Sequence, residues 1–294
     1  MITRVTNPML AATAGRGLRA GMSDLARLQD TASSGVRLTR PSDDPAATAS
    51  ALRVRSAQAA HGQYSRNIDD ATGWLVTLDT SLGNATDTLR SARNLTIQGA
   101  NASTMSPQAR EALAIEISSL RDALLAEANT EYLGRSVYAG NSIAGAAFDA
   151  DYVFSGAPGS TVTRRIDDTT AVRVDADGAR AFGEGDASAF ALLDRIVADL
   201  RAGQPITSHL DAIDERMAAI STERSAVGAR HAQVERGKEL LMAADSELEA
   251  QRSSLEDADL ATTLIELKMQ EVAYQAALSV TARALQPSLL QFLS

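Results

Sequence analysis

Few of the residues that most often carry chemistry occur in this chain of 294 residues. Cysteine is absent, so the sequence offers neither a disulfide nor a thiolate ligand for a metal. The three histidines, His61, His209 and His231, lie in helical patterns and none has a nucleophile pair nearby. We therefore expect no catalytic residue, no metal site and no cofactor, and we do not expect an enzyme.

Two further clusters suggest chemistry but have a simpler structural explanation. The glycines from Gly15 to Gly21 suggest a phosphate loop, but no strand precedes them and their spacing matches neither standard glycine motif. Asp43 and Asp44 could bind a metal, yet the run Ser-Asp-Asp-Pro at 42–45 is also how a helix begins. We expect a helix at the glycines and a helix cap at the aspartates.

The charge of the chain is unevenly distributed. The net charge is −9, which argues against nucleic acid as a partner because phosphate binding needs a basic surface. Residues 1–40 hold six arginines against two aspartates, a net of +4, whereas residues 245–294 hold eight carboxylates against three basic residues, a net of −5. We expect the two ends to attract each other, although salt screens this attraction beyond about 8 Å.

The sequence does not predict a membrane protein. No run approaches the roughly 18 apolar residues that a membrane-spanning helix requires. The first eight residues lack a basic region followed by an apolar stretch, so Sec-type secretion is not expected. Any export would need another route.

Heptad patterns predict long helices that pack against one another. From Tyr64 to Ala92 apolar residues recur in alternating steps of four and three. From Ile213 to Leu255 an apolar residue recurs every seventh position across six heptads. Because an ideal helix drifts by about 20° per heptad, this stripe predicts left-handed supercoiling against a neighbouring helix.

Single residues mark where two further helices are expected to begin or end. Ser106 before Pro107 predicts the N-cap of a third long helix, which could pack as an antiparallel return. Another helix is expected to begin near Asp186 or Ser188 and to stop at Gly203.

The segment from about 130 to 186 loses the helical period and predicts a small β-rich insert. Residues 152–154 and 172–174 have the composition or alternation of short strands. The pair Asp177-Gly178 after the second segment predicts a hairpin turn.

Amphipathic helices are expected at both ends of the chain. Near the C-terminus one apolar stripe runs from Leu260 to Phe292, and a second stripe from Ile265 to Val280 lies beside it. Together the two stripes form an apolar face that is too wide to be covered by one partner helix, so we expect this helix to make contacts on two sides. Near the N-terminus the glycines cost about 1 kcal/mol each relative to alanine, so that helix would be marginal alone.

The terminal motifs resemble those of flagellins and flagellar hook-associated proteins. Residues 34–38 (SGVRL) followed by 40–45 (RPSDDP) resemble the amino-terminal signature of this family, and the proline-flanked form is more like the hook-associated proteins. Residues 256–259 (EDAD), 274–278 (YQAAL) and 287–293 (PSLLQFL) resemble its C-terminal motifs. Residues 134–140 match the family's exit from the helical hairpin. Within the family, the length favours hook-associated protein 3 over the much longer hook-associated protein 1.

The resemblance implies a mainly α protein: a long coiled-coil bundle formed by the N- and C-terminal regions, with a small β-rich inserted domain. Three parts are expected: terminal helices 1–40 and 258–294 pairing in an assembly core, a helical bundle of 41–129 and 187–257, and a β-rich outer domain of 130–186. We expect the assembly interface to comprise Leu18, Met22, Leu25, Arg40, Pro41, Ser42, Asp43, Asp44, Pro45, Leu264, Leu267, Tyr274, Leu278, Leu285, Leu289, Leu290 and Phe292.

The function implied is that of a structural subunit exported through the flagellar type III apparatus with an export chaperone. It would assemble as a helical ring at the junction of hook and filament, outside the cell. Its partners would be hook-associated protein 1, flagellin and further copies of itself, without nucleic acid or membrane insertion. Two alternatives stay open: a short flagellin with the same termini, and a cytoplasmic coiled-coil regulator.

Overall fold

The structure is a computed structural model that describes residues 7–157 and 159–285. It divides into two compact units. The central unit comprises residues 60–244, and the terminal unit comprises the described residues up to 59 and from 245 onward. Helices dominate both units, so the predicted mainly α fold is confirmed.

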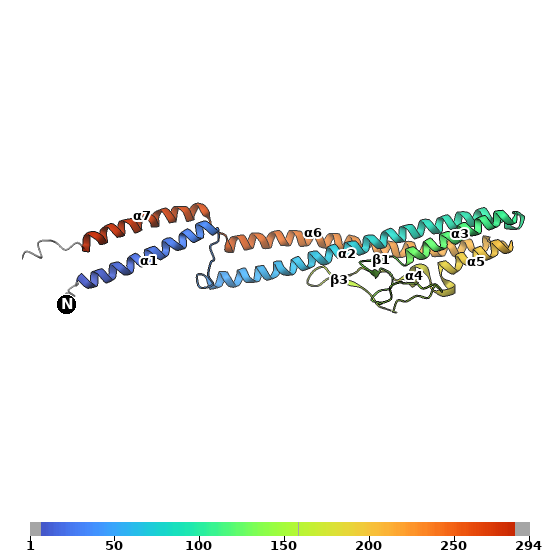
Figure 1. Ribbon diagram of the computed structural model, residues 1–294, viewed down its shortest axis with the longest axis horizontal. Coiled ribbons are helices and arrows are strands. Elements are labelled where there is room, and N and C mark those ends of the chain that lie inside the picture. The colour runs from blue at the N-terminus through green and yellow to red at the C-terminus, as the bar shows by residue number, and fades with distance from the viewer. Residues whose placement is uncertain (1–6, 158, 286–294) are drawn as a thin grey trace, which may run out of the picture. The chain divides into compact units, whose positions relative to one another are not determined.

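Two long helices, α2 (Pro45–Gln98) and α6 (Leu210–Glu256), contribute to both units. Within the central unit they run antiparallel (Figure 1), and three ion pairs link them. These pairs are Arg93–Asp214, Asp79–Arg224 and Asp69–Lys238, and their residue numbers add to nearly the same value each time. The pairing of residues between α2 and α6 therefore stays nearly constant along this stretch.

The predicted heptad seams are the buried faces of these two helices. On α2, every apolar seam residue from Ile68 to Ala92 is fully buried. On α6, the residues Ile213, Ile220, Val227 and Val234 are fully buried, while Leu241 and Leu248 are only half-buried. The period of seven therefore identified both long helices and the face each of them buries.

The shorter helices α3 (Pro107–Ala128) and α5 (Ala189–Ala202) pack together against this seam. Ser106 caps α3 by accepting a hydrogen bond from the amide of Ala109 with Pro107 at the first position, as predicted. Ser188 caps α5, and Gly203 ends it with a left-handed conformation at φ 70°, also as predicted. Asn84 of α2 donates to Glu127 near the end of α3, which confirms the antiparallel return.

The insert contains less strand than its sequence suggests. It has two small antiparallel hairpins, β1 (Glu131–Tyr132) with β2 (Arg135–Ser136) and β3 (Thr163–Arg165) with β4 (Ala171–Arg173). A short helix α4 (Gly178–Phe182) follows, and the 3₁₀ segments η1 (Gly99–Thr104), η2 (Gly185–Ala187) and η3 (Thr207–His209) connect the longer helices.

Two predictions within the insert were wrong. Asp177-Gly178 is no hairpin turn, because the Asp177 side chain accepts from the amide of Arg180 and caps α4. An aspartate before a glycine serves either role, and here a helix follows. Residues 152–154 form no strand but only an isolated bridge from Phe154 to Phe148.

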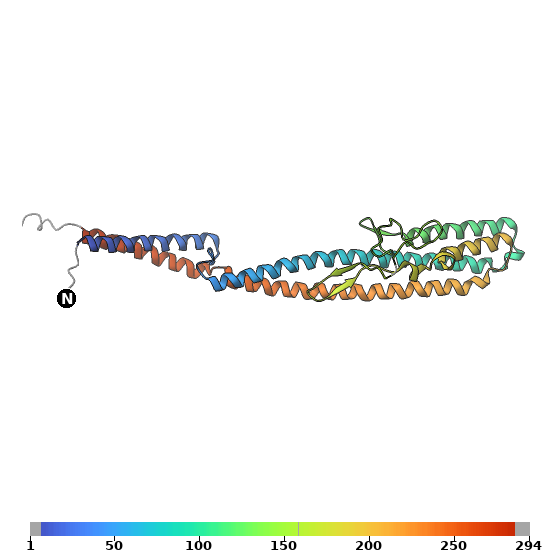
Figure 2. The same cartoon turned by 90° about the horizontal axis from the view of Figure 1, so that it is seen from below.

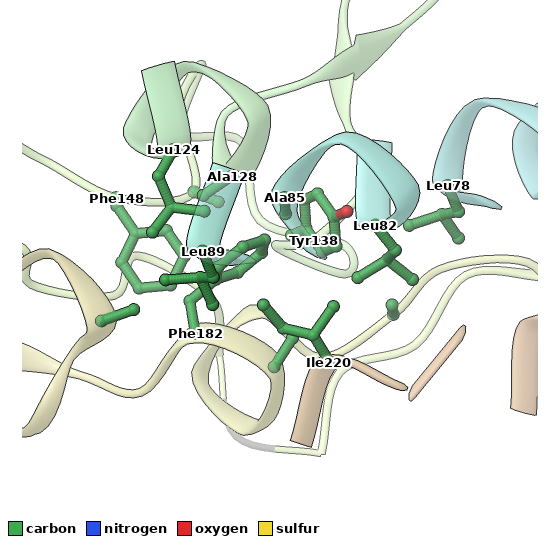
Figure 3. Close-up of a cluster of buried hydrophobic side chains, with 14 of the residues drawn as sticks. Leu78, Leu82, Ala85, Leu89, Leu124, Ala128, Tyr138, Phe148, Phe182 and Ile220 are labelled. Carbon is green, nitrogen blue, oxygen red and sulfur yellow. The ribbon is translucent and has the colours of Figure 1, made fainter. Parts of the chain in front are cut away.

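The hydrophobic core of the central unit continues into the insert (Figure 3). Figure 3 shows leucines of α2 and α3 converging on Tyr138 and Phe148 of the insert, Phe182 of α4 and Ile220 of α6. The Tyr138 hydroxyl is hydrogen-bonded to Ser81 of α2, and burial raises the pKa of Tyr138. The insert is therefore part of the core of the central unit.

In the terminal unit, α1 (Asn7–Ser34) packs against α7 (Leu260–Leu285) (Figures 1 and 2). The pair is antiparallel, because Gly35 contacts Ala258 and Gly21 contacts Gln270. The division into two units differs from the three parts that we expected, since residues 41–59 and 245–257 group with the terminal helices and the insert groups with the bundle. The separate assembly roles of the three parts stay a prediction. No described helix combines the length and apolarity needed to cross a bilayer.

Candidate assembly interface

The α1/α7 pair is held by a narrow seam. Leu18, Leu25 and Leu28 of α1 are half-buried, and no described side chain of α1 is fully buried. Gln270 Nε2 donates to the backbone oxygen of Gly21 at 3.2 Å. A Cβ at Gly21 would lie 3.4 Å from the Tyr274 ring, so the helices approach closely at this point. The pair is thus in contact but thinly packed.

Most of the apolar face of α7 stays open to solvent. The exposed large side chains on it retain between 43% and 66% of their accessible surface; they are Leu260, Leu264, Ile265, Met269, Val272, Leu278 and Val280. By contrast, Leu267 and Tyr274 are half-buried. Of the two stripes that the sequence predicted, the second, from Ile265 to Val280, is therefore uncovered, and the first, which begins at Leu260, is partly covered by α1.

The residues that follow α1 form hydrogen bonds with the residues that connect α6 to α7. Gly35, at φ 70°, accepts from the amide of Ala258 at 2.8 Å, and Val36 forms a bridge with Asp257. The Arg37 amide donates to the carbonyl of Glu256 at 2.7 Å. This segment gives a structural role to the Ser-Gly-Val-Arg motif near the N-terminus.

Three arginines surround the last turn of α6. Arg37 Nη2 donates to the carbonyl of Leu255 at 2.9 Å. Arg55 of α2 holds both carboxylate oxygens of Glu256, at 2.8 and 2.9 Å, and Arg252 lies 3.3 Å from one of them. Glu256 is only 4% exposed. We call this group, Arg37, Arg55, Arg252 and Glu256, the joint.

The proline-flanked motif folds as a turn that leads into α2. The Asp43 carboxylate accepts from the Arg40 amide at 3.1 Å and lies 3.3 Å from the Thr39 hydroxyl. The Asp44 carboxylate accepts from the Ala47 amide at 2.9 Å and caps α2, which begins at Pro45. The interpretation of this run as a helix cap is confirmed.

A cavity of about 400 Å³ lies between this turn and α1. Its lining is formed by Ser23, Ala26, Arg27 and Asp30 of α1 with Thr39, Arg40 and Asp43 of the turn. Two basic and two acidic side chains face it, so the lining has no net charge. The cavity sits beside the predicted interface residues and has room for side chains of another molecule.

The structure brings together most of the residues predicted for the interface. Leu18, Met22 and Leu25 lie on α1, and Leu264, Leu267, Tyr274 and Leu278 lie on α7. Arg40, Pro41 and Ser42 lie in the turn. The side chain of Leu285, and the whole of Leu289, Leu290 and Phe292, fall outside the described residues. That these residues contact neighbouring subunits stays a prediction.

The candidates for chemistry lie apart from this interface or have structural contacts. His209 is 2.7 Å from Asp199 and His231 is 3.7 Å from Glu235, both in the central unit. Gly15, Gly17 and Gly21 lie within α1. Among the residues that the structure describes, no three His, Cys, Asp or Glu side chains are grouped so that they could hold a metal ion.

Sequence reasoning missed the joint. In the sequence, Glu256 stands out only as part of the Glu-Asp-Ala-Asp motif at 256–259, and no pattern marks Arg55. Salt bridges between residues 201 positions apart leave no periodic signal. The available hint was Arg37 in an otherwise apolar motif, Gly-Val-Arg-Leu, at the end of a predicted helix.

Comparison with known families covers both ends of the chain. Residues 5–142 match the bacterial flagellin N-terminal helical region, and residues 210–293 match the bacterial flagellin C-terminal helical region. Together these matches cover about three quarters of the chain.

The chain belongs to the bacterial flagellin family.

Individual relatives agree with the family. Flagellar hook-associated protein 3 of Salmonella typhimurium is 25% identical, over 93% of this chain and 94% of that protein. A flagellin of Bacillus subtilis is 27% identical, over 86% of each chain. The resemblance stated from the terminal motifs is confirmed, and the chain is a structural protein of the bacterial flagellum.

Solved structures share the fold. A hook-associated protein from Vibrio parahaemolyticus superposes with a TM-score of 0.68 at 20% identity, over 73% of this chain and all of that one. Hook-associated protein 3 of Legionella pneumophila gives a TM-score of 0.62 at 16% identity, over 69% and 98% of the two chains. These two superpositions cover less of this chain than the sequence match to hook-associated protein 3 of Salmonella typhimurium covers.

Proposed function

We propose that this protein forms the junction between the flagellar hook and filament by helical self-assembly through α1 and α7. The observation that supports this most is the uncovered apolar face of α7. A helix with seven exposed large apolar side chains is a typical site of protein association. The relatives named as hook-associated protein 3 favour the junction as the place of assembly.

Burial of this face would supply the free energy of association. A large apolar side chain contributes about 1.5–3 kcal/mol when it goes from fully exposed to fully buried, so covering the surface that the seven side chains still expose contributes on the order of 10 kcal/mol. Loss of rotational and translational freedom and ordering of the helices oppose this gain. The glycines of α1 make that helix marginal alone, so neighbouring subunits would complete its order.

The proposed partners rest on the similarity to the hook-associated proteins. Each subunit would contact other copies of itself through heterologous contacts, which repeat helically and do not close as a dimer. Hook-associated protein 1 would lie on one side of the ring and flagellin on the other. The protein would pass through the flagellar type III apparatus with an export chaperone and act outside the cell, without catalysis.

A single substitution on the open face of α7 tests this function. Met269 is 61% exposed, so Met269→Glu leaves the fold of the monomer intact while placing a charge in the proposed contact. We expect cells with this variant to secrete the protein but to lose attached filaments. Met269→Leu is the matched control, because it keeps an apolar side chain of similar volume. Normal filaments with Met269→Glu would contradict the proposal.

A short flagellin is the second candidate, favoured by the flagellin of Bacillus subtilis at comparable identity. Counting copies in purified flagella separates the two: about one ring of molecules indicates the junction, and thousands per filament indicate flagellin. Absence of the protein from sheared flagella would instead favour the cytoplasmic coiled-coil regulator.

A further inference from the structure

The last turn of α6 is capped by a distant part of the chain. A helix ends with backbone carbonyls that have no partner within it. Here the carbonyls of Leu255 and Glu256 accept from the side chain and the amide of Arg37, which follows α1. A guanidinium at this end also interacts favourably with the helix dipole. Arg37 thus does for α6 what a C-cap residue usually does locally.

The Glu256 side chain fixes the position of those carbonyls. Its carboxylate binds the Arg55 guanidinium of α2 through two hydrogen bonds, and the fork geometry leaves little freedom. Directly after Glu256, Asp257 and Ala258 pair with the segment that follows α1, and α7 begins at Leu260. Four segments of the chain therefore meet around Glu256.

We infer that Glu256 is a positioning residue for assembly, which presents α1 and α7 as one preformed pair. This inference rests on the proposed function, because it concerns how the assembling helices are held before subunits meet. Glu256 does not touch the neighbouring subunit. It anchors the end of α6 to α2, so that Arg37 and Ala258 can fix where α1 ends and α7 begins.

The seam between α1 and α7 is too thin to do this alone. Its leucines are half-buried, and one hydrogen bond, from Gln270 to Gly21, links the two helices among the described residues. By contrast, the two backbone hydrogen bonds of the Val36–Asp257 bridge and the bidentate ion pair of Arg55 with Glu256 are concentrated around a carboxylate that is 4% exposed. Order in the helix pair therefore depends on the joint.

The negative charge of Glu256 is needed for this role. A buried carboxylate is costly to desolvate and is compensated only by well-placed partners, which Arg55 and Arg252 supply. Glutamine has the same length but offers one acceptor oxygen and no charge, so it cannot hold both guanidinium groups. Loss of the charge would leave the two arginines to repel each other beside the end of α6.

Limited proteolysis of Glu256→Gln tests the inference. Trypsin cleaves after Arg37, whose amide and side chain are both engaged in the joint, so opening of the joint exposes this bond. We expect cleavage at Arg37 to be at least tenfold faster than in the wild type, as followed by mass spectrometry. Glu247→Gln is the matched control, because Glu247 is exposed and its carboxylate accepts only from Gln251 one turn away.

Two further readouts separate positioning from general destabilisation. The single tryptophan, Trp74, is buried in the central unit, so its fluorescence should not change in Glu256→Gln. A double variant, Arg55→Gln with Glu256→Gln, should be cleaved no faster than Glu256→Gln alone, because both changes remove the same contact. Additive effects of the two changes would contradict the assigned pairing.

Assembly completes the test. We expect Glu256→Gln to attach few filaments, and Glu247→Gln to attach a normal number. If Glu256→Gln loses filaments while cleavage at Arg37 stays at the wild-type rate, the positioning role is wrong. If both cleavage and assembly stay normal, the inference also fails. Neither result affects the proposed function, which is tested independently by Met269→Glu.

Discussion

The two antiparallel helix pairs of this protein are built from the same residue types but packed to different extents. In the central unit, the seam of α2 from Ile68 to Ala92 is fully buried by α6 and its neighbours. In the terminal unit, the seam of α1 reaches only half burial and α7 keeps seven large apolar side chains exposed. The central pair is complete within one chain, whereas the terminal pair leaves apolar surface for other chains.

The glycines of α2 and α1 also differ in how closely other side chains pack against them. A Cβ at Gly73 of α2 would meet the Tyr132 hydroxyl at 2.2 Å, so this glycine is required by the packing. A Cβ at Gly15 or Gly17 of α1 would meet nothing within 4 Å. Among the residues that the structure describes, no contact requires Gly15 or Gly17, although each weakens the helix by about 1 kcal/mol.

The largest expected effect is from a cavity in the central seam. Leu82→Ala removes a fully buried side chain and should lower the free energy of unfolding by about 3 kcal/mol. Urea unfolding followed by Trp74 fluorescence measures this. Leu25→Ala on α1 is the matched change in the terminal unit and should leave that transition unchanged. Equal losses of unfolding free energy in Leu82→Ala and Leu25→Ala would contradict the difference in packing between the two helix pairs.

A smaller effect is expected from adding a methyl group to a glycine. Gly73→Ala forces the Tyr132 ring away, and we expect a net loss of about 1–2 kcal/mol despite the better helix propensity of alanine. The Tyr132 ring also lies 5.5 Å from the Trp74 ring, so tryptophan emission should shift. Gly17→Ala should instead raise the helix content measured by circular dichroism. Loss of helix in Gly17→Ala would contradict the open surroundings of this residue.

The pH dependence of the β3–β4 hairpin is expected to be smaller still. The amides of Thr169 and Thr170 donate to the Asp167 carboxylate and lower its pKa to about 2 from an ordinary 3.8. A lowered pKa stabilises the folded state above the unfolded value, and this stabilisation is lost as pH falls from about 4 to 2. Asp167→Asn keeps an acceptor but does not titrate.

Thermal unfolding of the wild type and Asp167→Asn, followed at Trp74 from pH 6 to pH 2, measures this contribution. The difference in Tm between the two proteins should be constant above pH 5 and should shrink below pH 4. A difference that grows on acidification would mean that the hairpin is not stabilised by the ionised carboxylate.

Periodic features of the fold were predictable from the sequence, and contacts between distant segments were not. The apolar residue at every seventh position from Ile213 onward predicted α6. Ser106 and Gly203 predicted where helices begin and end. These signals depend on residues that are close in sequence. The insert was harder, since Asp177 suits both a turn and a cap. The joint could not be predicted, because Arg55 and Glu256 meet only once both long helices are placed.

The smallest effect is expected from the ion pairs on the surface of the central pair. Arg93 binds Asp214 through two hydrogen bonds of 2.7 and 3.0 Å, and this guanidinium lowers the pKa of the Asp214 carboxyl. Both side chains are substantially exposed, so solvent screens their attraction. Arg93→Gln should leave the urea midpoint unchanged at physiological salt and lower it only slightly at low ionic strength, where screening weakens. A large loss at physiological salt would mean that such pairs, and not the buried seam alone, hold the central helices together.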